Sequence, residues 1–183
     1  MMDRYLVQHC SPTLASLKTA NLFTYSYEND SALQLQMEYW NREMAEKGIS
    51  LLVLRKHEHK ALIYVCRKSR LEENLKKPEI MQFLSDYGYR NFQVDDALKR
   101  LSFRLSSQDG FPHEIGIFLD YPLGDVIGFI QNAGQNYKCA GCWKVYCNEC
   151  DTIKTFAKYK KCRDIYTRLW SQGKNILQLT VAA

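Results

Sequence analysis

The chain has 183 residues, of which 46% are apolar and 25% charged, and its formal net charge is +5. This length allows one domain with a buried core, and no apolar stretch approaches the roughly 20 residues that a bilayer-spanning helix requires. The modest positive charge does not by itself indicate nucleic acid binding. We therefore expect one domain over residues 1–183, located in the cytoplasm, with no membrane partner and no nucleic acid partner.

The N-terminal segment predicts a strand followed by a helix, with a cysteine at the turn between them. The apolar run 5–7 is typical of a strand, and Ser11 and Pro12 are residues that cap and begin helices. We therefore expect a short helix over 13–19. The first amides of a helix carry positive partial charge and favour a thiolate, so this position predicts a reactive Cys10 with a lowered pKa.

The same helix start would also favour a bound anion. The residues that we expect around such an anion are His9, Ser11, Thr13 and Lys18. An equally simple interpretation is that Ser11 only caps the helix and that Cys10 packs in the core. The seven cysteines are an odd number in a chain of this length, which favours free thiols, a metal or redox chemistry over a disulfide framework.

The middle of the chain alternates between strand and helix patterns. Apolar residues at helical spacing after Asp30 or Ser31 predict a helix that ends at Gly48. Two apolar runs around a polar tip at 56–60 predict a hairpin, and three helices are expected between residues 69 and 107, two of which begin at Pro78 and Val94.

Residues 111–130 predict two short helices that meet at a Tyr-Pro bend. Gly116, Gly124 and Gly128 leave little side-chain bulk there, which indicates close approach of another backbone or of a flat ligand. His113 lies beside Glu114 in this segment and is a candidate acid–base residue, with Cys10 as the second catalytic candidate. The alternative for His113 is a capping or packing role.

Four cysteines, Cys139, Cys142, Cys147 and Cys150, have the paired spacing of a zinc or iron site. The four residues between the pairs have strand composition, and a strand would separate the pairs by roughly 13–20 Å. One tetrahedral site is therefore disfavoured, and free thiols, a metal and a redox couple stay open. We assign no metal ligand.

A long helix is predicted over 151–172, and one of its faces is basic. The cations on this face are Lys154, Lys158, Lys161 and Arg168. Such a face suits an acidic protein partner, and it is also typical of a solvated helix surface. After Gly173, the apolar run 176–181 predicts a closing strand.

Several strings spread along the chain resemble DUF3793, a family of unknown function from anaerobic Firmicutes. These strings are His9–Ala15, Phe111–Ile130, Tyr137–Cys139 with Trp143–Tyr146, Phe156–Cys162 and Leu177–Val181. The resemblance carries no established activity, and it implies a role beside flavodoxins or ferrous-iron transport, in iron, haem or low-potential electron metabolism. It also implies that Cys139 belongs to the family pattern, whereas the other three clustered cysteines are particular to this chain.

Two functional hypotheses follow. In the first, the protein binds a small anionic ligand or cofactor, such as a tetrapyrrole, in a pocket between the Cys10 turn and the 111–130 helix pair. In the second, it is an adaptor without chemistry that docks an acidic partner such as a flavodoxin through the basic 154–168 face. The sequence assigns no particular cofactor.

For the fold, we expect an α+β domain with a largely antiparallel sheet covered by helices. Its strands are predicted near residues 20–27, 49–56, 60–67, 142–147 and 175–181.

Overall fold

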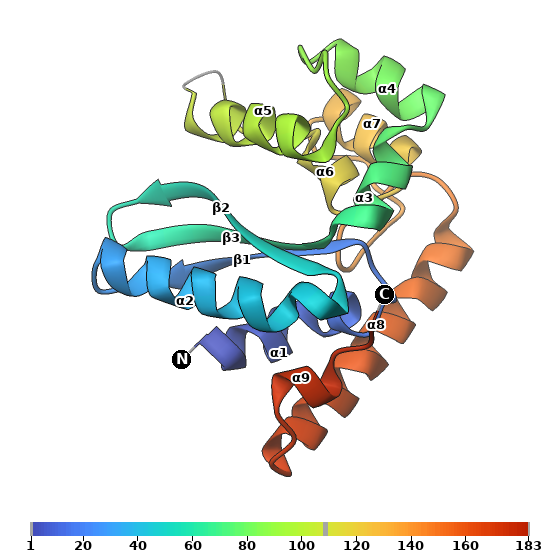
Figure 1. Ribbon diagram of the computed structural model, residues 1–183. Coiled ribbons are helices and arrows are strands. Elements are labelled where there is room, and N and C mark those ends of the chain that lie inside the picture. Colours follow the sequence, from blue (N-terminus) through green and yellow to red (C-terminus); the bar gives the residue numbers. More distant parts are fainter. Residues whose placement is uncertain (1, 108–109, 183) are drawn as a thin grey trace.

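The computed structural model describes residues 2–107 and 110–182, and it shows an α+β fold built on an antiparallel sheet (Figure 1). The sheet has the order β1-β3-β2, with β1 at Ala20–Ser26, β2 at Ile49–His57 and β3 at Lys60–Arg67. The central strand β3 pairs antiparallel with both neighbours. The predicted fold class and the predicted hairpin are confirmed.

Helices make up most of the remaining described chain. Their bounds are α1 Met2–Leu14, α2 Asp30–Met44, the 3-10 helix η1 Ala45–Lys47, α3 Lys68–Leu75, α4 Pro78–Ser85, α5 Val94–Ser106, α6 Ile115–Phe118, α7 Leu123–Gln131, α8 Glu149–Ser171 and α9 Ile176–Leu179. The predicted helix starts at Pro78 and Val94 are confirmed, as are the two short helices within 111–130 and the long helix near the C-terminus.

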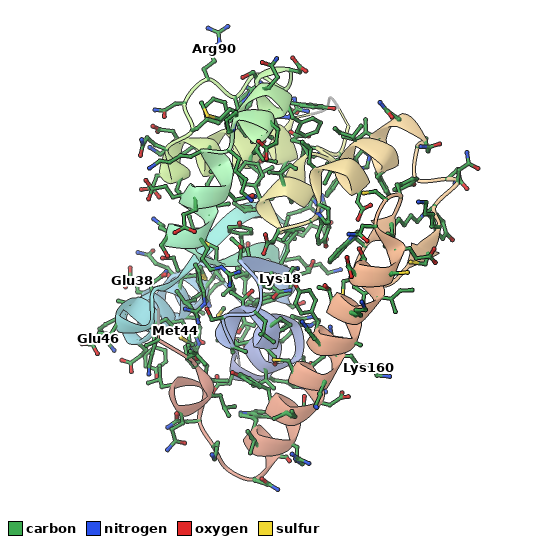
Figure 2. The ribbon with its side chains drawn as sticks, turned by 90° about the vertical axis from the view of Figure 1, so that its right-hand side faces the viewer. Lys18, Glu38, Met44, Glu46, Arg90 and Lys160 are labelled. Carbon is green, nitrogen blue, oxygen red and sulfur yellow. The ribbon has the colours of Figure 1, made fainter. Side chains whose placement is uncertain are left out.

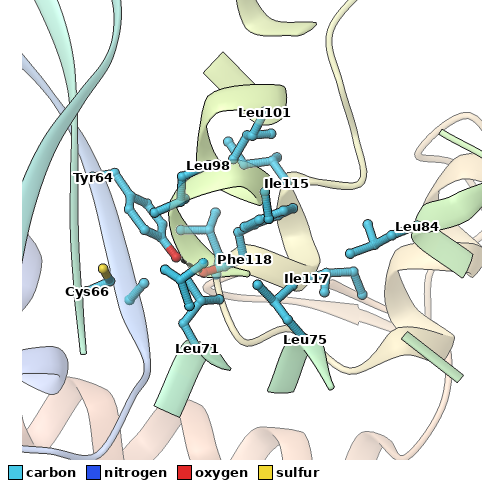
Figure 3. Close-up of a cluster of buried hydrophobic side chains, with 14 of the residues drawn as sticks. Tyr64, Cys66, Leu71, Leu75, Leu84, Leu98, Leu101, Ile115, Ile117 and Phe118 are labelled. Atoms are coloured by element: carbon cyan, nitrogen blue, oxygen red, sulfur yellow. Dashed lines mark hydrogen bonds between the residues drawn. The ribbon is translucent and has the colours of Figure 1, made fainter. Parts of the chain in front are cut away.

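The sheet separates two apolar cores, and the central strand contributes to both. Ala61, Ile63 and Val65 face the core formed with α1 and α2, whereas Tyr64 and Cys66 face the core formed with α3 to α7. This alternation is the period-2 pattern of a strand that is buried on both faces. Figure 3 shows the second core, in which the Tyr64 hydroxyl donates a hydrogen bond to the carbonyl of Phe118.

The N-terminal prediction of a strand followed by a helix start is wrong. The whole segment is the helix α1, and its buried apolar residues are Met2, Leu6, Val7, Cys10 and Leu14. Their spacing is helical, so one face of α1 packs against the sheet. Pro12 lies in the last turn of α1 and not at a helix start. The helix ends two residues later in a left-handed cap at Ser16, where the amides of Ser16 and Leu17 donate to the carbonyls of Thr13 and Pro12. The helix predicted over 13–19 is therefore absent from the described chain.

Two of the five predicted strands are not part of the sheet. The strand expected at 142–147 is reduced to β5 Lys144–Val145, which pairs with β4 Cys139–Ala140 in a separate hairpin. The strand expected at 175–181 is replaced by α9, because Asn175 and Gln178 form a reciprocal capping box that begins a helix. The apolar residues of this segment still pack on α1, but they do so from a helical turn.

One buried arginine connects four parts of the chain. Arg67 ends β3 with only 1% of its surface exposed. Its guanidinium donates hydrogen bonds to the carbonyl oxygens of Thr13, Leu14, Lys47 and Val181, at 2.7–3.2 Å. Two of these carbonyls lie at the C-terminal end of α1, where the negative end of the helix dipole stabilises a cation. Arg67 thereby holds the end of α1, η1 and the C-terminal segment against the sheet.

Replacing Arg67 by methionine tests this role. The Arg67→Met substitution leaves several buried carbonyl groups without a donor, and each such group costs about 1–3 kcal/mol. We expect the free energy of unfolding, measured in urea, to fall by at least about 3 kcal/mol. The exposed Arg90, labelled in Figure 2, is the matched control, and Arg90→Met is expected to change this free energy by less than about 0.5 kcal/mol. Equal effects of the two substitutions would contradict the assignment.

Candidate functional site

Cys10 is not an accessible thiol at a helix start. It lies inside α1 with none of its surface exposed, and burial raises the pKa of its thiol far above the ordinary value. The predicted lowering of this pKa is wrong, because the amides next to Cys10 are engaged within the helix. The Cys10 side chain packs in the core between α1 and the sheet.

Ser11 and Thr13 do not face a cavity either. Both are buried, and Ser11 Oγ donates a hydrogen bond to the carbonyl of Val7 in the same helix. Thr13 Oγ1 donates to Asn21 Oδ1 at 2.7 Å, which ties the end of α1 to β1. These two hydroxyls hold the backbone in place and do not line the cavities described below.

A hollow lies between α1, α8 and the segment that follows α6, and Cys10 does not line it. Its volume is about 300 Å³. We call it the cationic cavity, and its functional side chains are His9, Lys18, Tyr121, Cys142, Tyr159 and Arg163. Of the predicted ligand-binding residues, His9 and Lys18 therefore share one space, whereas Ser11 and Thr13 do not reach it.

Lys18 is the most unusual residue of this cavity. Only 3% of its surface is exposed, and its ammonium makes no hydrogen bond or ion pair with any residue that the structure describes. The ring centroids of Tyr121 and Tyr159 lie 5.1 and 6.0 Å from its Nζ. Burial lowers the pKa of Lys18 to about 8, although the nearby Cys142 and Asp120 act in the opposite direction. Figure 2 labels Lys18 near the centre of the molecule.

The turn that carries Lys18 is held at both ends. The backbone amides of Leu17 and Lys18 donate to the carbonyl of Pro12, at 2.8 and 3.1 Å. On the other side, Thr19 donates to the carboxylate of Asp120 through both its amide and its hydroxyl. This carboxylate is therefore bound to Thr19 and does not form an ion pair with the Lys18 ammonium, and the turn keeps the ammonium in the cavity.

The other polar groups of the cationic cavity also favour an anion. Arg163 is exposed and has no hydrogen-bond or ion-pair partner within the described ranges. His9 stacks on Phe23 with ring centroids 5.7 Å apart. Burial and the Arg163 charge lower the pKa of His9, so its imidazole is neutral at pH 7. The cavity thus presents two cations and a neutral imidazole.

His113 lies in a second hollow of about 430 Å³, which we call the aromatic cavity. Its ring-bearing side chains are Phe111, His113, Tyr121, Phe129 and Trp143. The His113 ring contacts those of Phe129 and Phe111, with centroids 4.9 and 5.5 Å apart. His113 and the sealed Cys10 do not line a common cavity, so the structure does not bring the two catalytic candidates together.

The glycines of the 111–130 segment accommodate side chains of the β4–β5 hairpin. A Cβ on Gly128 would lie 2.5 Å from the Tyr146 ring, and one on Gly124 would lie 2.8 Å from Cys147 Sγ. The sequence predicted another backbone or a flat ligand at this face, and at these two positions that prediction is wrong. Side chains of the hairpin fill the space that the glycines leave.

Asp125 joins the hairpin to α7 and shapes the aromatic cavity. Its buried carboxylate accepts hydrogen bonds from Trp143 Nε1 at 2.8 Å, from the amides of Tyr146 and Cys147, and from Cys147 Sγ. Burial acts to raise the pKa of Asp125, but these hydrogen bonds outweigh it and the net shift is downward. The Trp143 ring is thereby held against Tyr121, with centroids 4.7 Å apart.

The clustered cysteines lie around this hairpin. Cys142 lines the cationic cavity, Cys147 donates to Asp125, and Cys139 and Cys150 lie on β4 and in the first turn of α8. All seven cysteines are free thiols in the structure. Among the residues that the structure describes, no three histidine, cysteine, aspartate or glutamate side chains lie together in a way that could hold a metal ion.

The predicted basic face of α8 is exposed. Lys154, Lys158, Lys161 and Arg168 all lie on the surface of this helix. Lys154 pairs with Asp151 at 3.3 Å, whereas the other three side chains make no ion pair within residues 2–107 and 110–182. The opposite side of α8, which includes the buried Tyr159 and Cys162, packs toward α1.

The sequence did not identify several residues of the two cavities. In the sequence, Tyr121, Tyr159 and Trp143 look like ordinary core residues. They line the cavities only because α8 and the hairpin meet the end of α6. Arg163 is one of many cations on α8. The feature that could have identified it as a cavity residue is its position next to Cys162, which is buried. A cation at the edge of a buried helix face is a candidate for lining a cavity.

The role of Asp125 is tested by Asp125→Asn, with the exposed Asp86→Asn as control. We expect Asp125→Asn to lower the free energy of unfolding at pH 7 by about 1–3 kcal/mol, because a neutral amide accepts these hydrogen bonds less strongly. The pKa of Asp125 is depressed in the folded state, so its contribution is present above about pH 4 and is lost as the pH falls through the folded value. Urea unfolding at pH 7 and pH 3 measures both effects. A deficit equal to that of Asp86→Asn would refute the role.

A family model described as "Protein of unknown function (DUF3793)" matches residues 6–180. The searches of curated proteins and of solved structures found no match. Within the described residues, no helix combines the length and the apolar character needed to cross a membrane. Because the match extends over nearly the full length, the chain belongs to the DUF3793 family of proteins of unknown function.

Proposed function

We propose that this protein binds a small anionic ligand in the cationic cavity. The observation that carries the proposal is Lys18, which is almost fully buried and whose ammonium lines a hollow without a hydrogen-bond or ion-pair partner among the described residues. Burying a charge is unfavourable unless the charge is paired, so an unpaired buried cation in a cavity is typical of a binding site. Arg163 at the edge of the same cavity adds a second cation.

The ligand-free and the ligand-bound protein differ in how the charge of Lys18 is compensated. In the empty cavity, desolvation of Lys18 opposes folding, and this is reflected in its lowered pKa. An anion in the cavity would supply the missing charged hydrogen bonds, and ligand binding would stabilise the fold by mass action. Tetrapyrrole carboxylates belong to this class of anion, and we keep iron- or haem-linked metabolism as the setting that we propose for the ligand.

Sulfate is a suitable probe because its charge is constant between pH 6 and pH 10. We expect sulfate, titrated by calorimetry at pH 7, to bind at least 10-fold more weakly to Lys18→Met than to the unaltered protein, since a charged hydrogen bond contributes about 1.5–3 kcal/mol. The matched control is Lys174→Met, which removes an exposed lysine and leaves sulfate binding unchanged. Without sulfate, Lys18→Met is expected to raise the Tm, because it removes a desolvated charge.

The same titration has a defined pH dependence. The pKa of Lys18 is about 8 in the folded, ligand-free protein, so the affinity for sulfate falls as the pH rises through this value. In the unfolded chain, Lys18 keeps its proton up to about pH 10.4. As the pH rises from about 8 to about 10.4, the ligand-free protein therefore gains stability relative to Lys18→Met. Sulfate affinity that is insensitive to both Lys18→Met and pH would overturn the proposed function.

A second candidate function rests on the basic face of α8. Lys158, Lys161 and Arg168 are exposed there without ion pairs within the described chain. Lys161 and Arg168 border a surface hollow of about 450 Å³, and Lys158 and Lys161 border a second hollow of about 350 Å³. Unpaired surface cations of one sign accelerate and orient association with a partner of opposite charge. We propose an acidic protein such as a flavodoxin as this partner.

Charge reversal tests the second candidate. The double substitution Lys158→Glu with Lys161→Glu is expected to weaken flavodoxin binding at least 10-fold at low salt, as measured by calorimetry. The unaltered protein should lose affinity as the salt concentration rises, because exposed charges are screened. Lys60→Glu with Lys77→Glu changes the net charge equally at exposed sites away from α8 and serves as the control. Equal losses for both pairs would show that only net charge matters and would refute a docking face.

A further inference from the structure

The cationic and aromatic cavities adjoin each other. Leu22, Leu119 and Tyr121 line both hollows, so the two spaces meet at these side chains. The Tyr121 ring stacks on Trp143, and the Lys18 ammonium lies 5.1 Å from the Tyr121 ring centroid. A ligand at the boundary would therefore contact an aromatic surface on one side and a buried cation on the other.

The aromatic cavity offers rings and has few free polar groups. Asp125 is saturated by hydrogen bonds from the hairpin, and Lys144 donates its Nζ to the carbonyl of Gly134 at 2.7 Å. The rings in its walls belong to Phe111, His113, Tyr121, Phe129 and Trp143, and the His113 imidazole is the polar one that faces the space. Such walls bind flat aromatic groups by stacking and by edge-to-face contact. A volume of about 430 Å³ lies within the usual range for small-molecule sites.

These two observations define one class of ligand. We infer that the ligand is an aromatic acid, with one or two fused rings held in the aromatic cavity and one anionic group beside Lys18 in the cationic cavity. This inference rests on the proposed function and specifies its ligand. A purely inorganic anion would leave the aromatic walls uncovered, and a neutral aromatic molecule would leave Lys18 without a partner.

Three probes measure the contributions of the rings and of the anionic group separately. Naphthalene-2-sulfonate carries both the rings and the charge, naphthalene-2-sulfonamide carries the rings without the charge, and methanesulfonate carries the charge without the rings. Calorimetric titration of the unaltered protein at pH 7 is expected to give a Kd for naphthalene-2-sulfonate at least 10-fold below that of either other probe. This comparison needs no substitution and so does not depend on the folding of a variant.

Two substitutions then test where the rings and the anionic group of the ligand bind. Ala140 is exposed on β4 and lines the aromatic cavity, so Ala140→Trp is expected to fill its mouth and to weaken naphthalene-2-sulfonate at least 10-fold without changing methanesulfonate. The control Ala157→Trp places the same side chain at an exposed position on α8. Lys18→Met is expected to reduce naphthalene-2-sulfonate to the affinity of the sulfonamide. Urea unfolding checks that each variant is folded.

The failures of the two proposals are distinguishable. If naphthalene-2-sulfonate binds no better than methanesulfonate, and both depend on Lys18, the aromatic half is refuted while the anion site stands. If the sulfonamide equals the sulfonate and Lys18→Met changes neither, the ligand class is refuted, and loss of Lys18-dependent sulfate binding would refute the anion site as well. If Ala140→Trp and Ala157→Trp weaken binding equally, the assigned position of the rings is wrong.

Discussion

The architecture depends on the hydrogen bonds of the Arg67 guanidinium at the end of the central strand. Arg67 is buried with its donors directed at backbone carbonyls of α1, η1 and the C-terminal segment. Carbonyl dipoles at the end of a helix stabilise the charge without a carboxylate partner, so the cation stays charged inside the protein. The segment that leaves α1 is fixed by this contact, and Lys18 lies in that segment.

Arg67 and Lys18 differ in how the protein compensates a buried positive charge. Both are buried cations, with 1% and 3% of their surfaces exposed. Arg67 has its donors satisfied by the protein, and its charge therefore contributes to the fold. Among the described residues, Lys18 lies over two tyrosine rings and makes no hydrogen bond or ion pair, so the protein compensates its charge less completely. Burying the Lys18 charge without a paired partner lowers the stability of the fold, so folding does not explain why a lysine stands at this position.

The aromatic side of the site depends on a different polar contact. Asp125 holds Trp143 and the β4–β5 hairpin against α7, and the glycines of α7 allow the hairpin side chains to approach closely. Because β4 and β5 contain only two residues each, strand pairing alone does little to fix the hairpin, and the carboxylate adds hydrogen bonds to it. The two cavities thus share Tyr121 but are built by separate interactions.

The sequence by itself determined the elements that depend on local pattern: the β2–β3 hairpin, the helix starts at Pro78 and Val94, and the exposed basic face of α8. It also placed Lys18 among the candidate ligand-binding residues, and Lys18 lines a cavity in the structure. Local pattern failed for α1 and α9, because a short apolar run fits a strand or a helix equally well until the packing of one face decides between them. Only the tertiary structure decided that Cys10 is sealed and that Lys18, Arg163 and Tyr121 share a cavity, because these positions come from contacts between segments far apart in the chain.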